Sequence, residues 1–167
     1  MTVTVLFKDG GRQGGFLHVT DYPVIPKALW PWRTFQVTIA HITLATRDVQ
    51  QSLNFFTQCF NWRPLNRPGN IECQAAWLAI GPHQELHLVE VKNFNPSPFE
   101  SEFGRHIAID FPGVQFDELK ERITHHGAEL VAPQRETPFE RFFFRDLNGY
   151  LFEVVDSNRV PESTPSS

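Results

Sequence analysis

Four polar side chains occupy matching positions in two similar stretches of this sequence. His41 begins the run His-Ile-Thr-Leu, and His106 begins the run His-Ile-Ala-Ile 65 positions later. His87 and Glu153 each lie inside a later apolar run, 66 positions apart. Imidazole nitrogens and carboxylate oxygens are donors that proteins use for divalent transition metals. If the two stretches meet around one cavity, these four residues predict a divalent-metal site.

The segments that follow the two histidine runs have the pattern of amphipathic helices. Asp48 can cap the first helix, whose apolar face is formed by Val49, Leu53, Phe56 and Phe60. The second helix is expected within 115–126, and its apolar face holds Phe116, Leu119 and Ile123. The helices should end at Asn61 and Gly127, because Asn and Gly best accept the left-handed backbone at a helix C-terminus.

Each helix is followed by a segment typical of a β-hairpin. The first hairpin is expected over 77–80 and 86–89, and the second over 142–145 and 151–155, with turns at 81–83 and 146–149. Apolar residues flank His87 and Glu153, so strand alternation points these two side chains away from an apolar layer. The pattern of each half therefore predicts one strand, then a helix, then about three strands. The fold class is α+β, with two tandem βαβββ modules at about 36–95 and 100–156.

The remaining segments differ in composition from this core of 36–156. Residues 1–35 form an N-terminal extension with a possible hairpin, and their glycines match turns better than any phosphate-binding fingerprint. The tail 157–167 is rich in Ser, Pro and Glu, and we expect it to be disordered.

Composition excludes several classes of protein. The 167 residues are 41% hydrophobic and 20% charged, as in globular proteins, and no apolar run approaches the length of a membrane span. The net charge of −4 and the absence of a basic run argue against a nucleic-acid partner. Cys59 and Cys73 lack metal or redox spacing, so we expect reduced, buried thiols and a cytoplasmic protein.

Several motifs together carry a family resemblance over roughly 38–156. His41-Ile-Thr-Leu followed by Asp48-Val-Gln-Gln-Ser-Leu-Asn-Phe-Phe resembles the opening strand and helix of the vicinal oxygen chelate superfamily, the glyoxalase/bleomycin-resistance/dioxygenase group. Arg105-His-Ile-Ala-Ile and Phe144-Arg-Asp-Leu-Asn-Gly-Tyr-Leu-Phe-Glu153 resemble its later motifs, with Leu147 where proline is usual. The resemblance implies that the two modules form a curved mixed sheet around a cleft that holds a divalent metal.

The resemblance also implies a set of site residues. The metal positions of the family fall on His41, His87, His106 and Glu153, with Zn, Ni, Fe, Mn or Co as the ion. Glu153, or a metal-bound water, would act as the catalytic base. His87 departs from the glutamate of lactoylglutathione lyases and from the glutamine of epimerases. A lone strand histidine is more commonly a hydrogen-bonded core residue, but the matched placement of all four favours metal binding.

Arginines beside the ligand strands are candidates for substrate binding. Arg105 and Arg145 could hold a carboxylate or phosphonate through a bidentate contact. Arg141 lies beside the same strands, and for each arginine singly a solvated position at a strand edge is the simpler interpretation.

The function implied is lyase or isomerase chemistry on a small molecule with vicinal oxygens, catalysed by a metal-dependent enzyme. One alternative is a metal-free binding protein of the bleomycin-resistance type. The other is a non-haem iron extradiol dioxygenase, since two histidines and a carboxylate match that iron site. Family members of this size are typically homodimers, and the cleft can lie within one chain or combine strands from two.

Overall fold

A computed structural model of the chain describes residues 38–66 and 69–158. The hairpin expected in 1–35 lies outside these ranges, as does most of the tail 157–167. By internal contacts the chain divides into two units, Met1–Thr38 and Ile39–Ser167.

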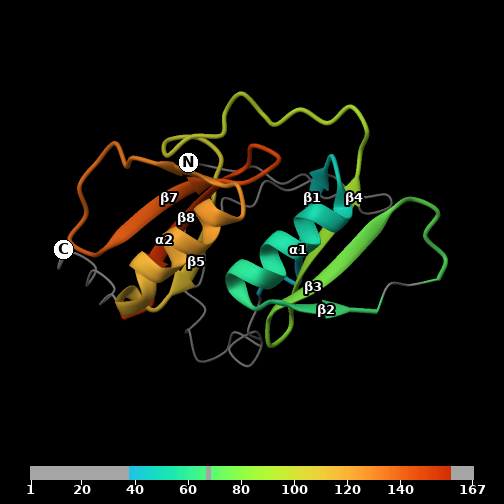
Figure 1. Cartoon of the computed structure of the whole chain (residues 1–167), viewed down its shortest axis with the longest axis horizontal. Helices are drawn as coiled ribbons and strands as arrows, with labels where there is room; N and C mark the ends of the chain where they lie inside the picture. Colours follow the sequence, from blue (N-terminus) through green and yellow to red (C-terminus); the bar gives the residue numbers. More distant parts are fainter. Residues whose placement is uncertain (1–37, 67–68, 159–167) are drawn as a thin grey trace, which may run out of the picture. The chain divides into compact units, whose positions relative to one another are not determined.

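The described part of the second unit repeats one order of elements (Figure 1). The first module contains β1 (His41–Thr46), α1 (Val49–Phe60), β2 (Arg63–Leu65), β3 (Ala75–Gly81) and β4 (Gln84–Glu90). The second contains β5 (Ile107–Phe111), a short 3-10 turn η3 (Gly113–Gln115), α2 (Phe116–His125), β6 (Glu129–Val131), β7 (Arg141–Arg145) and β8 (Leu151–Asp156). The predicted α+β fold of two tandem βαβββ modules is therefore confirmed.

Each module forms a four-stranded mixed sheet with the same strand order. The orders are β1-β4-β3-β2 and β5-β8-β7-β6, in which the first strand of each module is parallel to the last and the other neighbours are antiparallel. The register repeats as well, because His87 lies opposite Trp77 and Glu153 lies opposite Phe143. His87 and Glu153 are thus equivalent positions in space as well as in sequence.

Local signals define the ends of the helices as predicted. Asp48 caps α1 by accepting a hydrogen bond from the backbone N–H of Gln51. Asn61 follows α1 with a left-handed backbone, φ 55°, and Gly127 follows α2 with φ 90°. Only these residue types adopt such angles at little cost, so the sequence fixes where each helix stops.

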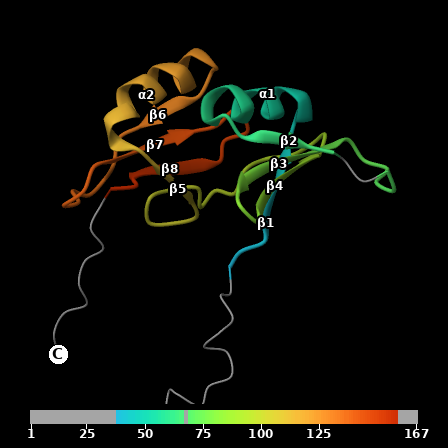
Figure 2. The same cartoon turned by 90° about the horizontal axis from the view of Figure 1, so that it is seen from below.

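Both helices cover the same face of the two sheets (Figure 2). Phe116, Leu119 and Ile123 are buried, as the spacing in α2 predicts. In α1 the buried face differs from the prediction: Phe55 and Cys59 are buried together with Phe56, whereas the other predicted residues are only partly buried against the core, namely Val49, Leu53 and Phe60. The ring of Phe55 lies 6.1 Å from that of Phe144 in β7, so α1 packs against the second module as well as its own sheet.

A buried polar network joins the two modules at the turn between β7 and β8. The side chain of Asn148 accepts hydrogen bonds from Thr46 Oγ1 and from Arg47 N, and it donates to Ser52 Oγ. Next to it, the hydroxyl of Tyr150 accepts a hydrogen bond from the backbone of Ala45. Satisfied buried networks of this kind favour one arrangement of the packed elements, so the turn fixes the second module to the end of β1.

The two cysteines lie in different surroundings. Cys59 is buried, and burial raises the pKa of its thiol to about 11, with Arg122 acting weakly against the shift. Cys73 is exposed, so the expectation that both thiols are buried is wrong for this residue, which lies in the connection before β3. The two cysteines form no disulfide bond with each other. Neither α1 nor α2, the helices of the described residues, is long and apolar enough to cross a membrane.

Candidate functional site

The first module presents two histidines on the sheet face opposite the helices. The rings of His41 in β1 and His87 in β4 are stacked, with centroids 4.3 Å apart and planes 11° from parallel. Trp77 lies beside His87 at a centroid distance of 5.2 Å. The Nε2 atom of His87 is 2.8 Å from Glu85 Oε2, which fixes the orientation of the imidazole. We call His41 and His87 the first pair.

The second module presents a histidine and a carboxylate at the equivalent positions. His106 Nε2, just before β5, lies 3.3 Å from Glu153 Oε2 in β8. The aromatic neighbour of this module is Phe143, whose ring centroid is 5.8 Å from that of His106. The other carboxylate oxygen, Glu153 Oε1, accepts a hydrogen bond of 2.8 Å from Arg141 Nη1. We call His106 and Glu153 the second pair.

The two pairs remain separate within the described residues of one chain. No three His, Cys, Asp or Glu side chains of 38–66 and 69–158 are grouped as metal ligands. A pocket of about 360 Å³ does extend from His41 to Ile107–Asp110 of β5. However, neither His87 nor the second pair lines this pocket. The described residues of one chain therefore do not bring the four candidates together, and the sequence prediction of a four-residue metal site stays a prediction.

The chemistry of the second pair fits a divalent metal ion. Two donors with bonds of about 2.1 Å to one ion lie roughly 3.0 to 3.4 Å apart at octahedral and tetrahedral angles, and His106 Nε2 and Glu153 Oε2 are 3.3 Å apart. The Nδ1 atom of His106 is buried and has no hydrogen-bond partner. The first pair would add two further nitrogen donors, which gives a set suited to Mn, Fe, Co, Ni or Zn.

Arg141 links Glu153 to a second buried carboxylate. The side chain of Arg141 is 3% exposed, and its Nη2 atom donates to Glu102 Oε1 and to the backbone carbonyl of Arg135. Burial alone would raise the pKa of Glu102, but hydrogen bonds from Gln134 N and Arg141, with the charges of Arg141 and Arg135, lower it below its ordinary value. Glu102 is therefore ionised at neutral pH and, with Glu153, balances the charge of Arg141.

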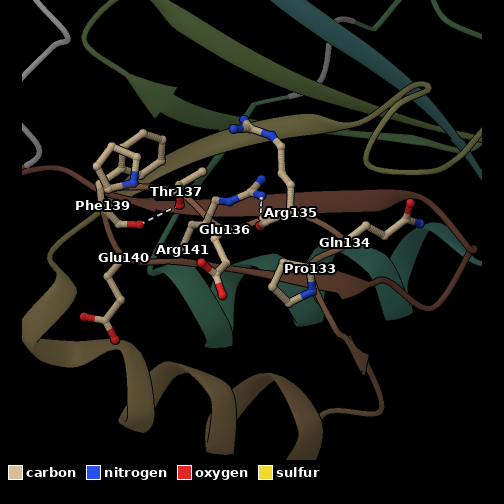
Figure 3. Close-up of a pocket in the computed structure, with 9 residues that line it drawn as sticks. Pro133, Gln134, Arg135, Glu136, Thr137, Phe139, Glu140 and Arg141 are labelled. Atoms are coloured by element: carbon tan, nitrogen blue, oxygen red, sulfur yellow. Dashed lines mark hydrogen bonds between the residues drawn. The ribbon is translucent and has the colours of Figure 1, made fainter.

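A pocket of about 680 Å³ lies against Arg141 (Figure 3). It is lined by residues 133–140 of the connection between β6 and β7 and by Arg141, the first residue of β7. Figure 3 shows Arg141 in the wall of this pocket, hydrogen-bonded to the main chain of Arg135. Arg141 therefore lines the pocket and also contacts Glu153 of the second pair.

The two arginines predicted for substrate binding make contacts within the protein. Arg105 Nε is 2.5 Å from Glu100 Oε1, and its guanidinium lies 5.1 Å from the centre of the Tyr150 ring. Arg145 donates to the backbone carbonyls of Gly149 and Glu100. Their role toward a substrate stays a prediction. The simpler interpretation of a solvated edge position is wrong for Arg141, because Glu102 and Glu153 compensate its charge in the interior.

Sequence reasoning missed two acidic residues of this region. Glu85 lies two positions before His87, so strand alternation places both on one face and could have identified it. Glu102 lies between β4 and β5, where no periodic pattern indicates which side chains turn inward.

The fold and the paired ligand candidates define a class of protein built from two βαβββ modules with polar residues at equivalent strand positions. A family model described as "Glyoxalase/Bleomycin resistance protein/Dioxygenase superfamily" matches residues 38–154. The chain belongs to this superfamily, and the resemblance seen in the sequence is confirmed.

Three known proteins illustrate the likeness. "Glyoxylase I 4" of Arabidopsis thaliana is 21% identical over 128 residues, which cover 74% of this chain and 73% of that protein. "Metallothiol transferase FosB" of Shouchella clausii is 23% identical over 122 residues, 70% of this chain and 77% of that one. A mutant of the fosfomycin resistance protein FosX of Listeria monocytogenes, solved with Mn(II) and 1S,2S-dihydroxypropylphosphonic acid, superposes with a TM-score of 0.59 at 22% identity, covering 74% of this chain and 91% of that one.

Proposed function

We propose that the protein is a metal-dependent enzyme that performs lyase or isomerase chemistry on a small molecule with vicinal oxygens. The observation that carries this proposal is the second pair, in which His106 Nε2 and Glu153 Oε2 are 3.3 Å apart at the positions equivalent to His41 and His87. A structural role alone does not require donors at matched positions of both modules. The superfamily membership of residues 38–154 supports the proposal.

His41, His87, His106 and Glu153 would hold the ion, and Mn(II) is the first to test because the FosX mutant was solved with it. When bound, a divalent metal acts as a Lewis acid that stabilises negative charge on a substrate oxygen. Glu153 would move the substrate proton as general base. Arg141 keeps Glu153 Oε1 in place, while Trp77 and Phe143 provide apolar surface beside the ligands.

The proposed site is completed by a second copy of the chain. Each chain carries both pairs but keeps them apart, as far as its described residues show. In a dimer with twofold symmetry, the first pair of one protomer can meet the second pair of the other, and symmetry then makes two equal sites. We therefore propose a cytoplasmic homodimer with a small-molecule substrate and no nucleic-acid partner.

One observation favours the metal-free alternative. Both oxygens of Glu153 already have protein partners, since Oε1 contacts Arg141 and Oε2 contacts His106. A binding protein of the bleomycin-resistance type would keep these contacts permanently and use the cleft only to enclose its ligand. The two proposals differ in whether the purified protein binds a divalent metal.

Metal analysis of the native protein tests the proposed function. We expect protein purified without chelators, or reconstituted after dialysis, to hold close to one equivalent of a divalent transition metal per chain, because a built site binds its ion tightly. Elemental analysis and Mn(II) titration followed by electron paramagnetic resonance would measure this. A content below about a tenth of an equivalent, with no gain on reconstitution, would leave the binding protein as the better account.

A further inference from the structure

A buried cluster of charges connects the second pair to the wall of the larger pocket. Arg141 is at its centre, with Nη1 on Glu153 Oε1 at 2.8 Å and Nη2 on Glu102 Oε1. Their side chains are 3%, 12% and 5% exposed for Arg141, Glu153 and Glu102 respectively. Carboxylates on both sides of one guanidinium compensate its charge, which is the condition for burying an ion at acceptable cost.

The same guanidinium and the same carboxylate hold the segment that lines the pocket. Arg141 Nη2 donates to the backbone carbonyl of Arg135, and Glu102 Oε2 accepts a hydrogen bond from the backbone N–H of Gln134. Arg135 also approaches Glu102, with Nε 3.5 Å from Oε1. Three segments distant in sequence therefore meet at Arg141: strand β8, the connection between β4 and β5, and the connection between β6 and β7.

A guanidinium is planar, so its donors cannot move independently of one another. A shift of Glu153 displaces Nη1, and the same rotation displaces Nη2 from Glu102 and Arg135. The Nε atom of Arg141 is buried without a hydrogen-bond partner, so it does not oppose such a rotation through a bond of its own. The position of the carboxylate and the position of residues 133–137 are thus set by one rigid group.

We propose that Arg141 is a positioning residue that orients Glu153 toward the metal and couples metal binding to the order of the pocket-lining segment 133–137. This inference rests on the proposed function. Outer-shell partners of metal ligands change metal affinity by about 10- to 100-fold when they are replaced. Coupling is reciprocal, so an ion bound at Glu153 should also make residues 133–137 more ordered.

The test uses the full chain and a double variant, Arg141→Met with Glu102→Met. The double variant removes one positive and one negative charge, so the local net charge does not change. Glu153 loses its arginine but keeps its contact with His106 Nε2. The matched control is Arg122→Met in α2, since Arg122 also contacts a glutamate, Glu118, and also has a buried Nε without a partner. An Arg141→Lys variant keeps the charge but not the planar fork, so its Mn(II) affinity should lie between those of the wild type and the double variant.

Mn(II) affinity and hydrogen exchange are measured on each protein, with the melting temperature as a check of folding. We expect 10- to 100-fold weaker Mn(II) binding in the double variant and wild-type affinity in the control. In the wild type, Mn(II) should slow amide exchange at 133–137 at least about threefold, and in the double variant it should not. If Arg141 had a merely structural role, the double variant would have a lower melting temperature than the wild type, and its amide exchange would be faster both with and without Mn(II).

Three outcomes would overturn the inference, and they differ in what they say of the proposed function. The double variant could bind Mn(II) with the affinity of the wild type, or Mn(II) could leave amide exchange at 133–137 unchanged in both the wild type and the double variant. Either result would mean that Arg141 does not act as proposed, although the proposed function stands. If the wild type binds no divalent metal at all, the proposed function and this inference fail together.

Discussion

Replacement of His106 by alanine is expected to weaken Mn(II) binding by at least about 100-fold, and to abolish any metal-dependent activity. Loss of a direct ligand should cost at least as much as loss of an outer-shell partner, for which 100-fold is the upper end. The variant should fold, because His106 Nδ1 has no partner and the Nε2 contact with Glu153 is the ion-pair contact it gives up. Mn(II) titration and circular dichroism would measure the two quantities.

A matched histidine variant makes this result specific. His83 is exposed in the turn between β3 and β4, so His83→Ala should bind Mn(II) like the wild type. A His106→Ala protein with unchanged Mn(II) affinity would contradict the metal site. The same variant separates the two functional proposals, because a metal-free binding protein has no need of an imidazole at this position.

The second large effect concerns stability. Phe56→Ala is expected to lower the free energy of unfolding by about 3–5 kcal/mol, the range for removing a buried phenylalanine ring. Phe56 is fully buried, its ring stacks on Trp62 at 5.3 Å, and it contacts Phe152 of β8 at 5.6 Å. Urea denaturation would measure the change in the free energy of unfolding. The substitution weakens the packing of α1 on its own module and on the second module.

The control for this prediction is another phenylalanine at the surface. Phe99 is 71% exposed, so Phe99→Ala should change the free energy of unfolding by no more than about 0.5 kcal/mol. Equal effects of the two substitutions would mean that Phe56 is not at the packed centre described here.

The repeat in the sequence predicted the fold because its signals are local. Caps at Asp48 and Asn61, the αL position of Gly127 and the alternation around Glu153 each act within a few residues. The helical face of α1 was only partly predicted, since Phe55 is buried and its ring packs beside Phe144 of the second module. A periodic sequence pattern predicts one apolar face of a helix, but it does not predict which side chains are buried by contacts between modules.

The sequence predicted which residues are candidates for the site, but it did not predict how they are arranged relative to one another. Offsets of 65 and 66 positions identify equivalent residues, yet they do not say whether equivalent strands face each other within one chain. That depends on how the modules are joined, which here involves the bonds of Asn148 to Thr46 and Ser52, about a hundred residues away. The burial of Arg141 depends in the same way on Glu102, in a connection without periodicity.

A mixed dimer tests the central claim that the metal site combines the first pair of one protomer with the second pair of the other. His41→Ala removes a ligand from the first pair and Glu153→Gln removes one from the second. Co-expressed with different tags and purified on both, the two chains form a dimer in which one site carries both defects and the other carries none. Mn(II) binding per dimer, followed by electron paramagnetic resonance, is the measurement.

We predict about one high-affinity Mn(II) per mixed dimer, about two in the wild-type dimer, and close to none in a dimer of either variant alone. If each site instead lay within a single chain, both chains of the mixed dimer would be defective. A mixed dimer that binds no more Mn(II) than the separate variants would therefore contradict the shared site.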